Sequence, residues 1–199
     1  MTSDLRRRVI RVARTTYLAI ERTPLAPLLR SQAVQRLKAR ITYMPAVRVL
    51  ALLDLIAAEA ILVYVAGGWG VDALTGRQTR QHYDLDLLID ADPVRVARVG
   101  DVLKREGFRK AGTEHNPGLP MPWRHLWQHD DGYSVEVLPA ALNDPPFGDT
   151  AFTFGTIEGR PVPCLSVALQ LALHTGYPPR SVDAADTDLL KKVRTVSTR

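Results

Sequence analysis

The amino-acid sequence predicts an α/β (α+β) fold, in which N-terminal and C-terminal helices surround a mixed β-sheet core. Residues 60–66, AILVYVA, are β-branched and aromatic, end at a glycine pair and precede a short helical pattern, as a buried strand does. Residues 83–90, YDLDLLID, alternate acidic and apolar side chains over a second strand. Helical patterns occupy both ends of the chain, with several short strand patterns between them.

The composition indicates a globular protein. The chain has 199 residues, of which 46% are hydrophobic and 24% charged, which suits one domain with an appended segment. The single cysteine, Cys164, excludes an internal disulfide and a cysteine-rich metal site, and a cytoplasmic location is expected. The longest apolar run, residues 46–68, contains Arg48, Asp54 and Glu59, so we expect no membrane span. The arginine-rich N-terminus lacks the features of a signal peptide.

The charge is distributed unevenly along the chain. Residues 1–44 contain ten lysines and arginines and two acidic residues, a net +8, whereas residues 45–199 contain sixteen and nineteen, a net −3. We therefore divide the chain into a basic helical extension, residues 1–44, and a main domain, residues 45–199. The extension, with helices expected over residues 3–20 and 28–41, suits a phosphate backbone, an acidic protein or a membrane surface, or is a solvated amphipathic helix pair.

The main domain begins with a helix and a strand and continues as an alternation of the two. Pro45 starts an apolar helix over residues 46–60, which precedes the strand over residues 60–66. A short helix over residues 68–76 ends at Gly76, a typical C-terminal cap. After the strand over residues 83–90, a helix over residues 93–107 begins with proline and ends with glycine.

Short strands and two helices complete the chain. The strands are expected over residues 108–113, 122–129, 133–139, 151–154 and 160–164. The second and third of these form a hairpin across the sequence DDG. The final helices are expected over residues 165–177 and 181–195, and the latter has acidic residues early and lysines late, as the helix dipole favours.

Two aspartates interrupt the apolar strand over residues 83–90. Because side chains alternate along a strand, Asp84 and Asp86 project from one face and can share a divalent cation, and carboxylates are the ligands that Mg²⁺ prefers. Glu136 is a third single acid in an apolar strand, and it would join the pair if the two strands are neighbours. The alternative is that the three acids are solvent-facing edge residues without a catalytic role.

The glycine pair is the second candidate feature. Gly67 and Gly68 lie between a strand and a helix, where glycine lets the backbone approach a ligand and the free N–H groups of the helix favour an anion. The chain has neither the P-loop pattern nor a full G-x-G-x-x-G motif. We therefore expect neither a P-loop nor a dinucleotide-binding fold.

Together these motifs resemble the nucleotidyltransferase superfamily with a polymerase-β-like active site, and most closely its small aminoglycoside and lincosamide nucleotidyltransferases. The similarity spans about residues 46–192 and leaves residues 1–44 outside. Many relatives have aspartate where this chain has Glu136, which leaves its exact role open. The residues that carry the resemblance are Gly67, Gly68, Trp69, Asp72, Gly76, Arg77, Arg80, His82, Asp84, Leu85, Asp86 and Glu136.

The resemblance implies a transferase that moves a nucleotidyl group from a nucleoside triphosphate, expected to be ATP, to a hydroxyl and releases pyrophosphate. Asp84 and Asp86 would hold Mg²⁺, and Glu136 would act as the base or complete a metal site. The same resemblance assigns the phosphates to the backbone of the glycine pair. It assigns triphosphate contacts to Arg77 and Arg80, whose alternative is a solvated loop.

The histidines and Trp69 are not expected to be catalytic. We expect His82 to hydrogen-bond the backbone and fix its loop, and Trp69 to pack rather than stack on a base. His125 and His129, which alternate on one strand, only weakly suggest a metal pair and are expected to line a cleft or the surface. His174 is expected to be a core histidine.

Three functions are compatible with these residues. The first is adenylylation of an aminoglycoside or lincosamide, which suits the net −3 domain. The second is nucleotide transfer to an RNA end such as that of tRNA, as in a toxin of a toxin–antitoxin pair, which the basic extension favours. The third is a degenerate transferase fold that only binds. Neither the triphosphate nor the oligomeric state follows from the sequence.

Overall fold

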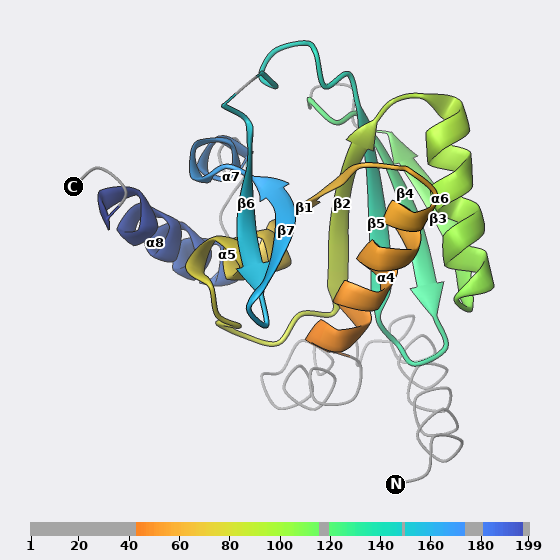
Figure 1. Ribbon diagram of the computed structural model, residues 1–199, viewed down its shortest axis with the longest axis horizontal. Helices are drawn as coiled ribbons and strands as arrows, with labels where there is room; N and C mark the ends of the chain where they lie inside the picture. The colour runs from red at the N-terminus through yellow and green to blue at the C-terminus, as the bar shows by residue number, and fades with distance from the viewer. Residues whose placement is uncertain (1–42, 116–119, 149, 174–180, 197–199) are drawn as a thin grey trace, which may run out of the picture.

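The computed structural model describes residues 43–115, 120–148, 150–173 and 181–196. Its strands form one seven-stranded sheet, in the order β3-β4-β5-β2-β1-β7-β6, with helices packed around it (Figure 1). The predicted α+β fold is confirmed. The elements in chain order are α4 (Ala46–Ala58), β1 (Val63–Ala66), α5 (Gly67–Thr75), β2 (Asp84–Asp90), α6 (Pro93–Arg105), β3 (Phe108–His115), β4 (Trp123–His129), β5 (Ser134–Ala140), β6 (Phe152–Ile157), β7 (Arg160–Leu165), α7 (Val167–Leu173) and α8 (Ser181–Val196).

The sheet mixes parallel and antiparallel pairs, as predicted. Strand β2 pairs with β5 in parallel and with β1 antiparallel, and β1 pairs with β7 in parallel. The remaining neighbours, β3 with β4, β4 with β5 and β6 with β7, are antiparallel. The predicted hairpin across DDG joins β4 to β5, and Gly132 in its turn has φ 91°, which glycine adopts without strain. Strand β5, which carries Glu136, is therefore the direct neighbour of β2, as the convergence of the three acids requires.

Local sequence signals explain where the two central helices begin and end. The Asp92 side chain accepts a hydrogen bond of 2.8 Å from the Val94 backbone N–H and so caps α6, and Pro93 occupies the first turn. Helix α5 ends at Gly76, which has φ 69° in the left-handed region, as predicted. These ends fix the turns that lead into and out of β2.

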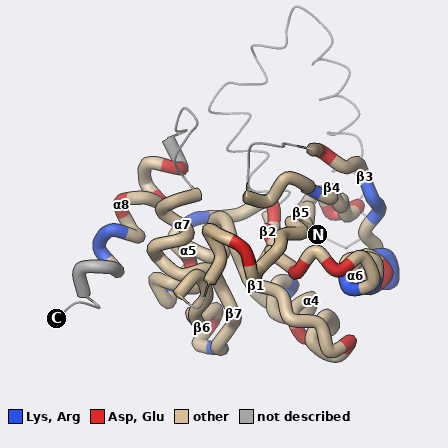
Figure 2. The backbone as a smooth tube through the Cα atoms, turned by 90° about the horizontal axis from the view of Figure 1, so that it is seen from above, with Lys and Arg blue, Asp and Glu red and all other residues tan. Residues whose placement is uncertain are grey.

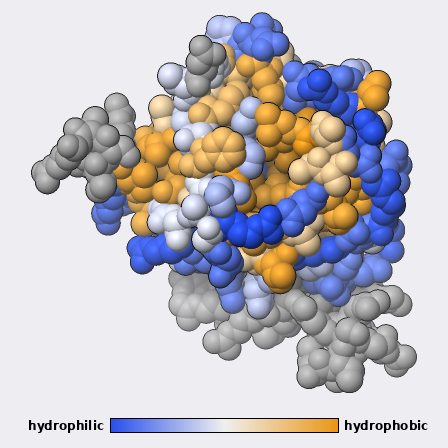
Figure 3. Space-filling view, viewed as in Figure 1, coloured by the Kyte–Doolittle hydropathy of each residue, from blue (hydrophilic) through white to orange (hydrophobic). Residues whose placement is uncertain are grey.

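The hydrophobic core lies on both faces of the sheet. On one face, α4 and α6 pack against Leu85, Leu87 and Ile89 of β2, all fully buried (Figure 1). On the other face, Leu88 belongs to a smaller core with residues of β5 and α7. Hydrophobic side chains gather at the centre of the surface seen in Figure 3, with hydrophilic ones along its right margin. None of the helices in the described part of the chain has the length and apolar character to traverse a bilayer.

The predicted basic extension lies outside the described residues, except for its last two, Tyr43 and Met44. Met44 is fully buried, and its backbone N–H donates a hydrogen bond of 2.7 Å to the carbonyl of His82. The division of the chain at residue 44, and the helices predicted over residues 3–20 and 28–41, remain predictions.

Candidate active site

The sheet register brings the three predicted acids together. Asp84 and Asp86 lie on β2 and Glu136 lies on β5, and in the parallel pairing of these strands Asp86 is directly opposite Glu136. Residues opposite one another in a sheet share a face, so all three carboxylates project from the same face as Leu88. The residues between them, Leu85 and Val135, are fully buried on the other face. The alternation of the sequence thus places an acidic cluster on one face of a buried strand.

Negative charge outweighs positive charge around Asp86. Burial raises the pKa of the Asp86 carboxyl well above its ordinary value, and the negative charges of Asp84 and Glu136 raise it further. The Arg124 guanidinium opposes this shift but does not cancel it. A cation bound between the aspartates would supply the missing positive charge, and their oxygens are the ligands that Mg²⁺ takes. The residues present therefore fit a divalent cation.

Glu136 is ion-paired to an arginine that sequence reasoning missed. Arg124 of β4 donates a hydrogen bond to a Glu136 carboxylate oxygen, and 15% of the Glu136 side chain is exposed against 37% of the Arg124 side chain. Among the described residues, no three acidic, histidine or cysteine side chains are arranged as a ready-made metal site. Arg124 lies in a strand rich in polar residues, WRHLWQH, so no alternation signal singled it out. Arg124 therefore compensates the charge of Glu136, whereas Asp84 and Asp86 have no such ion pair among the described residues.

The glycine pair is packed against the side chains of the site. A Cβ atom on Gly67, whose φ is +56°, would lie 1.9 Å from Oδ2 of Asp86. A Cβ atom on Gly68 would lie 2.3 Å from Nδ1 of His82 and 2.6 Å from a terminal guanidinium nitrogen of Arg80. Only glycine leaves room for these groups at the start of α5. The predicted contact of this backbone with phosphates remains a prediction.

His82 binds a carboxylate, not the backbone as expected. Its Nε2 lies 2.5 Å from Oδ2 of Asp72 on α5, and both side chains are almost completely buried. The other Asp72 oxygen accepts hydrogen bonds from the backbone N–H and hydroxyl of Thr79, at 2.9 and 2.5 Å. The expectation was wrong because α5 places the buried carboxylate of Asp72 next to His82. A carboxylate is a stronger hydrogen-bond acceptor than a backbone carbonyl. Trp69 is 1% exposed and packs against the His82 ring, as expected.

The two arginines of the loop before β2 have different environments. Two nitrogens of Arg80 bind Asp186 of α8, at 2.8 and 3.3 Å, and the Asp186 side chain is 3% exposed. Burial acts to lower the pKa of Arg80, but the hydrogen bond and charge of Asp186, with the charges of Asp72 and Asp84, raise it overall. Arg77 is exposed and lies beside Thr156, and nothing in the described residues ties it to the carboxylates. Only Arg80 is brought to the site.

The remaining histidines lie elsewhere. His125 and the hydroxyl of Thr113 are 3.1 Å apart, and His125 lines a cavity, as expected. His129 stacks on Tyr133 with ring centroids 4.8 Å apart. The prediction for His174 lies outside the described residues.

The chain is similar to known antibiotic-modifying enzymes. A family model described as aminoglycoside-2''-adenylyltransferase matches residues 48–190. A lincosamide resistance protein of Staphylococcus haemolyticus is 30% identical over 155 residues, which cover 71% of this chain and 91% of that protein.

Two groups of solved structures share the fold. The lincomycin-bound lincosamide adenylyltransferase LnuA matches with a TM-score of 0.63 and 27% identity, over 76% of this chain and 99% of that chain. ANT(2'')-Ia in complex with adenylyl-2''-tobramycin matches with a TM-score of 0.59 and 22% identity, over 76% and 93% of the two chains.

Proposed function

The chain belongs to the aminoglycoside-2''-adenylyltransferase family and is a nucleotidyltransferase, and we propose that it transfers an adenylyl group from ATP to a hydroxyl of a lincosamide or aminoglycoside antibiotic. The observation that carries this proposal is the parallel register of β2 and β5, which sets Glu136 beside the aspartate pair. The relative that is 30% identical favours a lincosamide as the first acceptor to test. The net −3 charge of residues 45–199 suits the positive charge of either antibiotic class.

Asp84 and Asp86 are proposed to hold Mg²⁺ together with the triphosphate. When bound, the ion neutralises negative charge on the transferred group and the leaving pyrophosphate. The raised pKa of Asp86 supports this assignment, because its two acidic neighbours leave the cluster short of positive charge.

Glu136 is proposed to be the general base. Its carboxylate takes the proton of the acceptor hydroxyl while that oxygen attacks the α-phosphorus, and the bond from this phosphorus to the pyrophosphate oxygen breaks. The ion pair with Arg124 supports the role of base over that of metal ligand, because the guanidinium already balances the charge of Glu136.

Arg80 and the glycine pair are proposed to bind the triphosphate. The Arg80 guanidinium lies against Gly68 at the start of α5, where backbone N–H groups favour an anion. Its ion pair with Asp186 fixes its direction. Arg77 remains a weaker candidate, because it is exposed and lies beside Thr156.

Transfer of label from the α-phosphate of a nucleotide tests the proposal. The full-length protein is incubated with Mg²⁺, each labelled nucleoside triphosphate in turn, and lincomycin, tobramycin or tRNA, with Asp86→Asn as the negative control. We expect label from ATP on an antibiotic and stoichiometric release of pyrophosphate. Label on tRNA alone, which the +8 charge of residues 1–44 would favour, would overturn the proposed acceptor. Nucleotide binding without transfer to any acceptor would favour the non-enzymatic alternative.

A further inference from the structure

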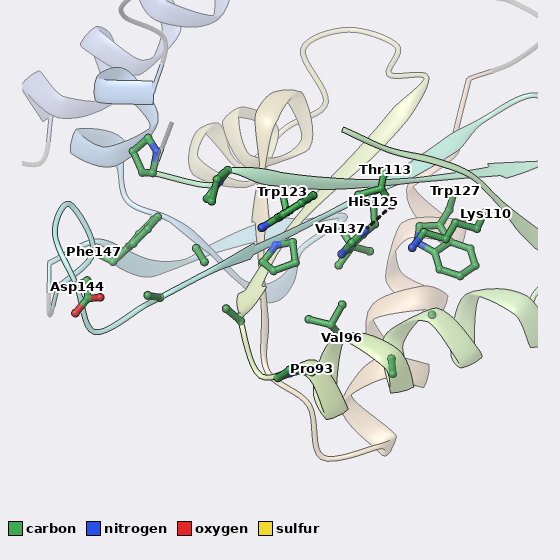
Figure 4. A pocket seen from close by; sticks show the side chains of 18 of the residues that line it. Pro93, Val96, Lys110, Thr113, Trp123, His125, Trp127, Val137, Asp144 and Phe147 are labelled. Carbon is green, nitrogen blue, oxygen red and sulfur yellow. Dashed lines mark hydrogen bonds between the residues drawn. The ribbon is translucent and has the colours of Figure 1, made fainter. Parts of the chain in front are cut away.

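A large cavity lies apart from the carboxylates, in the described part of the chain. Its volume is about 990 Å³, and α6, the strands β3, β4 and β5, and the segment after β5 surround it (Figure 4). Cavities of about 300–1,000 Å³ with mostly apolar walls are typical of small-molecule sites. The volume and the walls therefore suit a bound ligand.

The part of the cavity wall formed by β4 and by Val137 of β5 is on the opposite face of the sheet from the proposed reaction site. Val137 lines it and pairs with Leu87 and His125, all on the face that α6 covers. Glu136, the adjacent residue, projects from the other face. A ligand in this cavity therefore does not meet the acidic cluster, and the nucleotide and acceptor do not account for it.

Aromatic side chains form one wall. Trp123 is 46% exposed, an unusual state for so large an apolar group, and its ring centroid is 4.1 Å from that of His115. Trp127, four residues further along β4, is 5% exposed, and Phe147 lies at the other side of the cavity (Figure 4). A flat apolar ligand would cover the exposed indole face at little conformational cost.

Basic residues are concentrated near one end of the cavity, which is lined by Lys110 and by the ion pair of Lys104 with Asp101. Lysines and arginines lie along α6 and β3 (Figure 2), and five of the six there are ion-paired: Arg95, Arg98, Lys104, Arg105 and Arg109.

Lys110, the sixth, has no ion pair with any described residue and lines the cavity beside Trp127, where its charge also acts on His125. The acidic residue Asp144 lies at the opposite end, next to Phe147 (Figure 4). The charges therefore favour an anionic group at the Lys110 end.

His125 adds a neutral donor at that end. Burial and the Lys110 charge lower the pKa of His125, so the ring is neutral at pH 7. Nδ1 of His125 and the Thr113 hydroxyl form a hydrogen bond, and in the tautomer in which the hydroxyl donates, the ring proton is on Nε2 and can be donated to a ligand.

We propose that this cavity is a second small-molecule site that binds planar aromatic anions, with the ring system on Trp123 and the anionic group at Lys110 and His125. The site is independent of the proposed transferase reaction. A carboxylate, sulfonate or phosphate would serve as the anionic group, since each accepts charge-assisted hydrogen bonds.

The three tryptophans of the chain provide the test, because two line the cavity and the third, Trp69, is buried against His82 and does not line it. Indole N–H signals of the full-length protein are followed by NMR during titration with naphthalene-2-sulfonate. We expect saturable shifts of the Trp123 and Trp127 signals and no shift of the Trp69 signal. The matched cation, 2-naphthylmethylammonium, and the variant Lys110→Gln should each weaken binding by about tenfold.

A variant that fills the cavity, and a control variant outside it, test whether the ligand binds in the cavity. Ala97→Phe on α6 places a ring at the mouth and should abolish the shifts, whereas Ala57→Phe, at an exposed alanine of α4, should leave them unchanged. The proposal is overturned if no saturable shift occurs below about 1 mM, a weak affinity for such a ligand. It is also overturned if the cation binds equally well, if Ala97→Phe has no effect, or if Trp123 shifts with protein concentration alone, which would indicate a second copy of the chain.

Discussion

Asp186 of α8 binds Arg80, which precedes β2 by four residues, through two hydrogen bonds of 2.8 and 3.3 Å. The carboxylate is almost completely buried, whereas 31% of the arginine side chain is exposed. A buried acid that holds a partly exposed arginine orients the remaining guanidinium N–H groups toward solvent or a ligand. The C-terminal helix thereby contributes to the proposed triphosphate site without contacting the nucleotide.

Asp186→Asn should therefore raise the KM for ATP. Loss of the charged partner frees the Arg80 guanidinium, and we expect KM to increase about tenfold with a smaller change in kcat. Asp186→Glu should restore part of the affinity, and Asp188→Asn, at an exposed position of the same helix, should match the unmodified protein. Steady-state kinetics with parallel thermal melts separate this effect from unfolding. An unchanged KM in a folded Asp186→Asn variant would show that Arg80 does not need its partner.

Asp86→Asn should stabilise the protein while it abolishes activity. The pKa of the Asp86 carboxyl is raised in the folded state, so its protonated form stabilises the fold. This contribution is fully present below the pKa of the unfolded chain and is lost as the pH rises from there through the pKa of the folded state. At neutral pH the carboxylate therefore lowers stability, and the amide should raise Tm by about 2–4 °C, with a smaller gain at pH 5. Thermal melts of both proteins at the two pH values measure this.

Magnesium provides the second measurement for the same residue. An ion held by the aspartates should raise the Tm of the unmodified protein by mass action and leave Asp86→Asn unchanged. Equal responses of the two proteins to Mg²⁺ would remove Asp86 from the ligand set.

Arg124 and Glu136 should act as a unit. Glu136→Gln removes the proposed base and should lower kcat by about 10²–10⁴-fold, and Arg124→Gln, which leaves Glu136 beside two other acids, should lower it by about tenfold. The double variant should be no slower than Glu136→Gln alone, since the arginine acts through the glutamate. Arg109→Gln, which removes an exposed arginine of β3, is the control. Additive losses in kcat would assign Arg124 a separate role.

The sequence was sufficient to predict features that depend on local periodicity. The alternation over residues 83–90 predicted which side chains of β2 face the core, and Gly76 predicted the end of α5. The hairpin from β4 to β5 followed from its DDG turn. These signals are short-range, because a turn or a pleat is determined by a few neighbouring residues.

Contacts between distant segments could not be predicted. Nothing in the sequence placed β5 beside β2, or Arg124 beside Glu136, because strand order depends on tertiary packing that periodicity does not encode. The Arg80–Asp186 pair joins residues 106 positions apart and has no motif. The partner of His82 was predicted wrongly for the same reason, since α5 delivers Asp72 only after the chain has folded.

The Asp72–His82 pair should contribute to stability. Because both side chains are buried, Asp72→Ala leaves the histidine without its partner and should lower the free energy of unfolding by about 1–3 kcal/mol. His82→Ala should have a similar effect, and the double variant should show clear coupling, as measured by urea denaturation. Asp101→Ala, which breaks the exposed pair with Lys104, should produce no measurable change. Additive effects of the Asp72 and His82 substitutions on the free energy of unfolding would contradict a stabilising interaction between the two side chains.

Gly67→Ala tests whether the glycine makes room for the catalytic carboxylate. The added Cβ would lie 1.9 Å from Oδ2 of Asp86, and φ of +56° disfavours any side chain, so the Asp86 carboxylate must move. We expect kcat to fall at least about 100-fold, because a displacement of about 1 Å in a catalytic group costs this much. The backbone strain should lower stability by about 1–2 kcal/mol, so the variant stays folded. Gly112→Ala on β3 is the matched control, since no atom lies within 4 Å of its added Cβ. Near-normal kcat in a folded Gly67→Ala protein would contradict the requirement that the Asp86 carboxylate occupy the position that Gly67 leaves open.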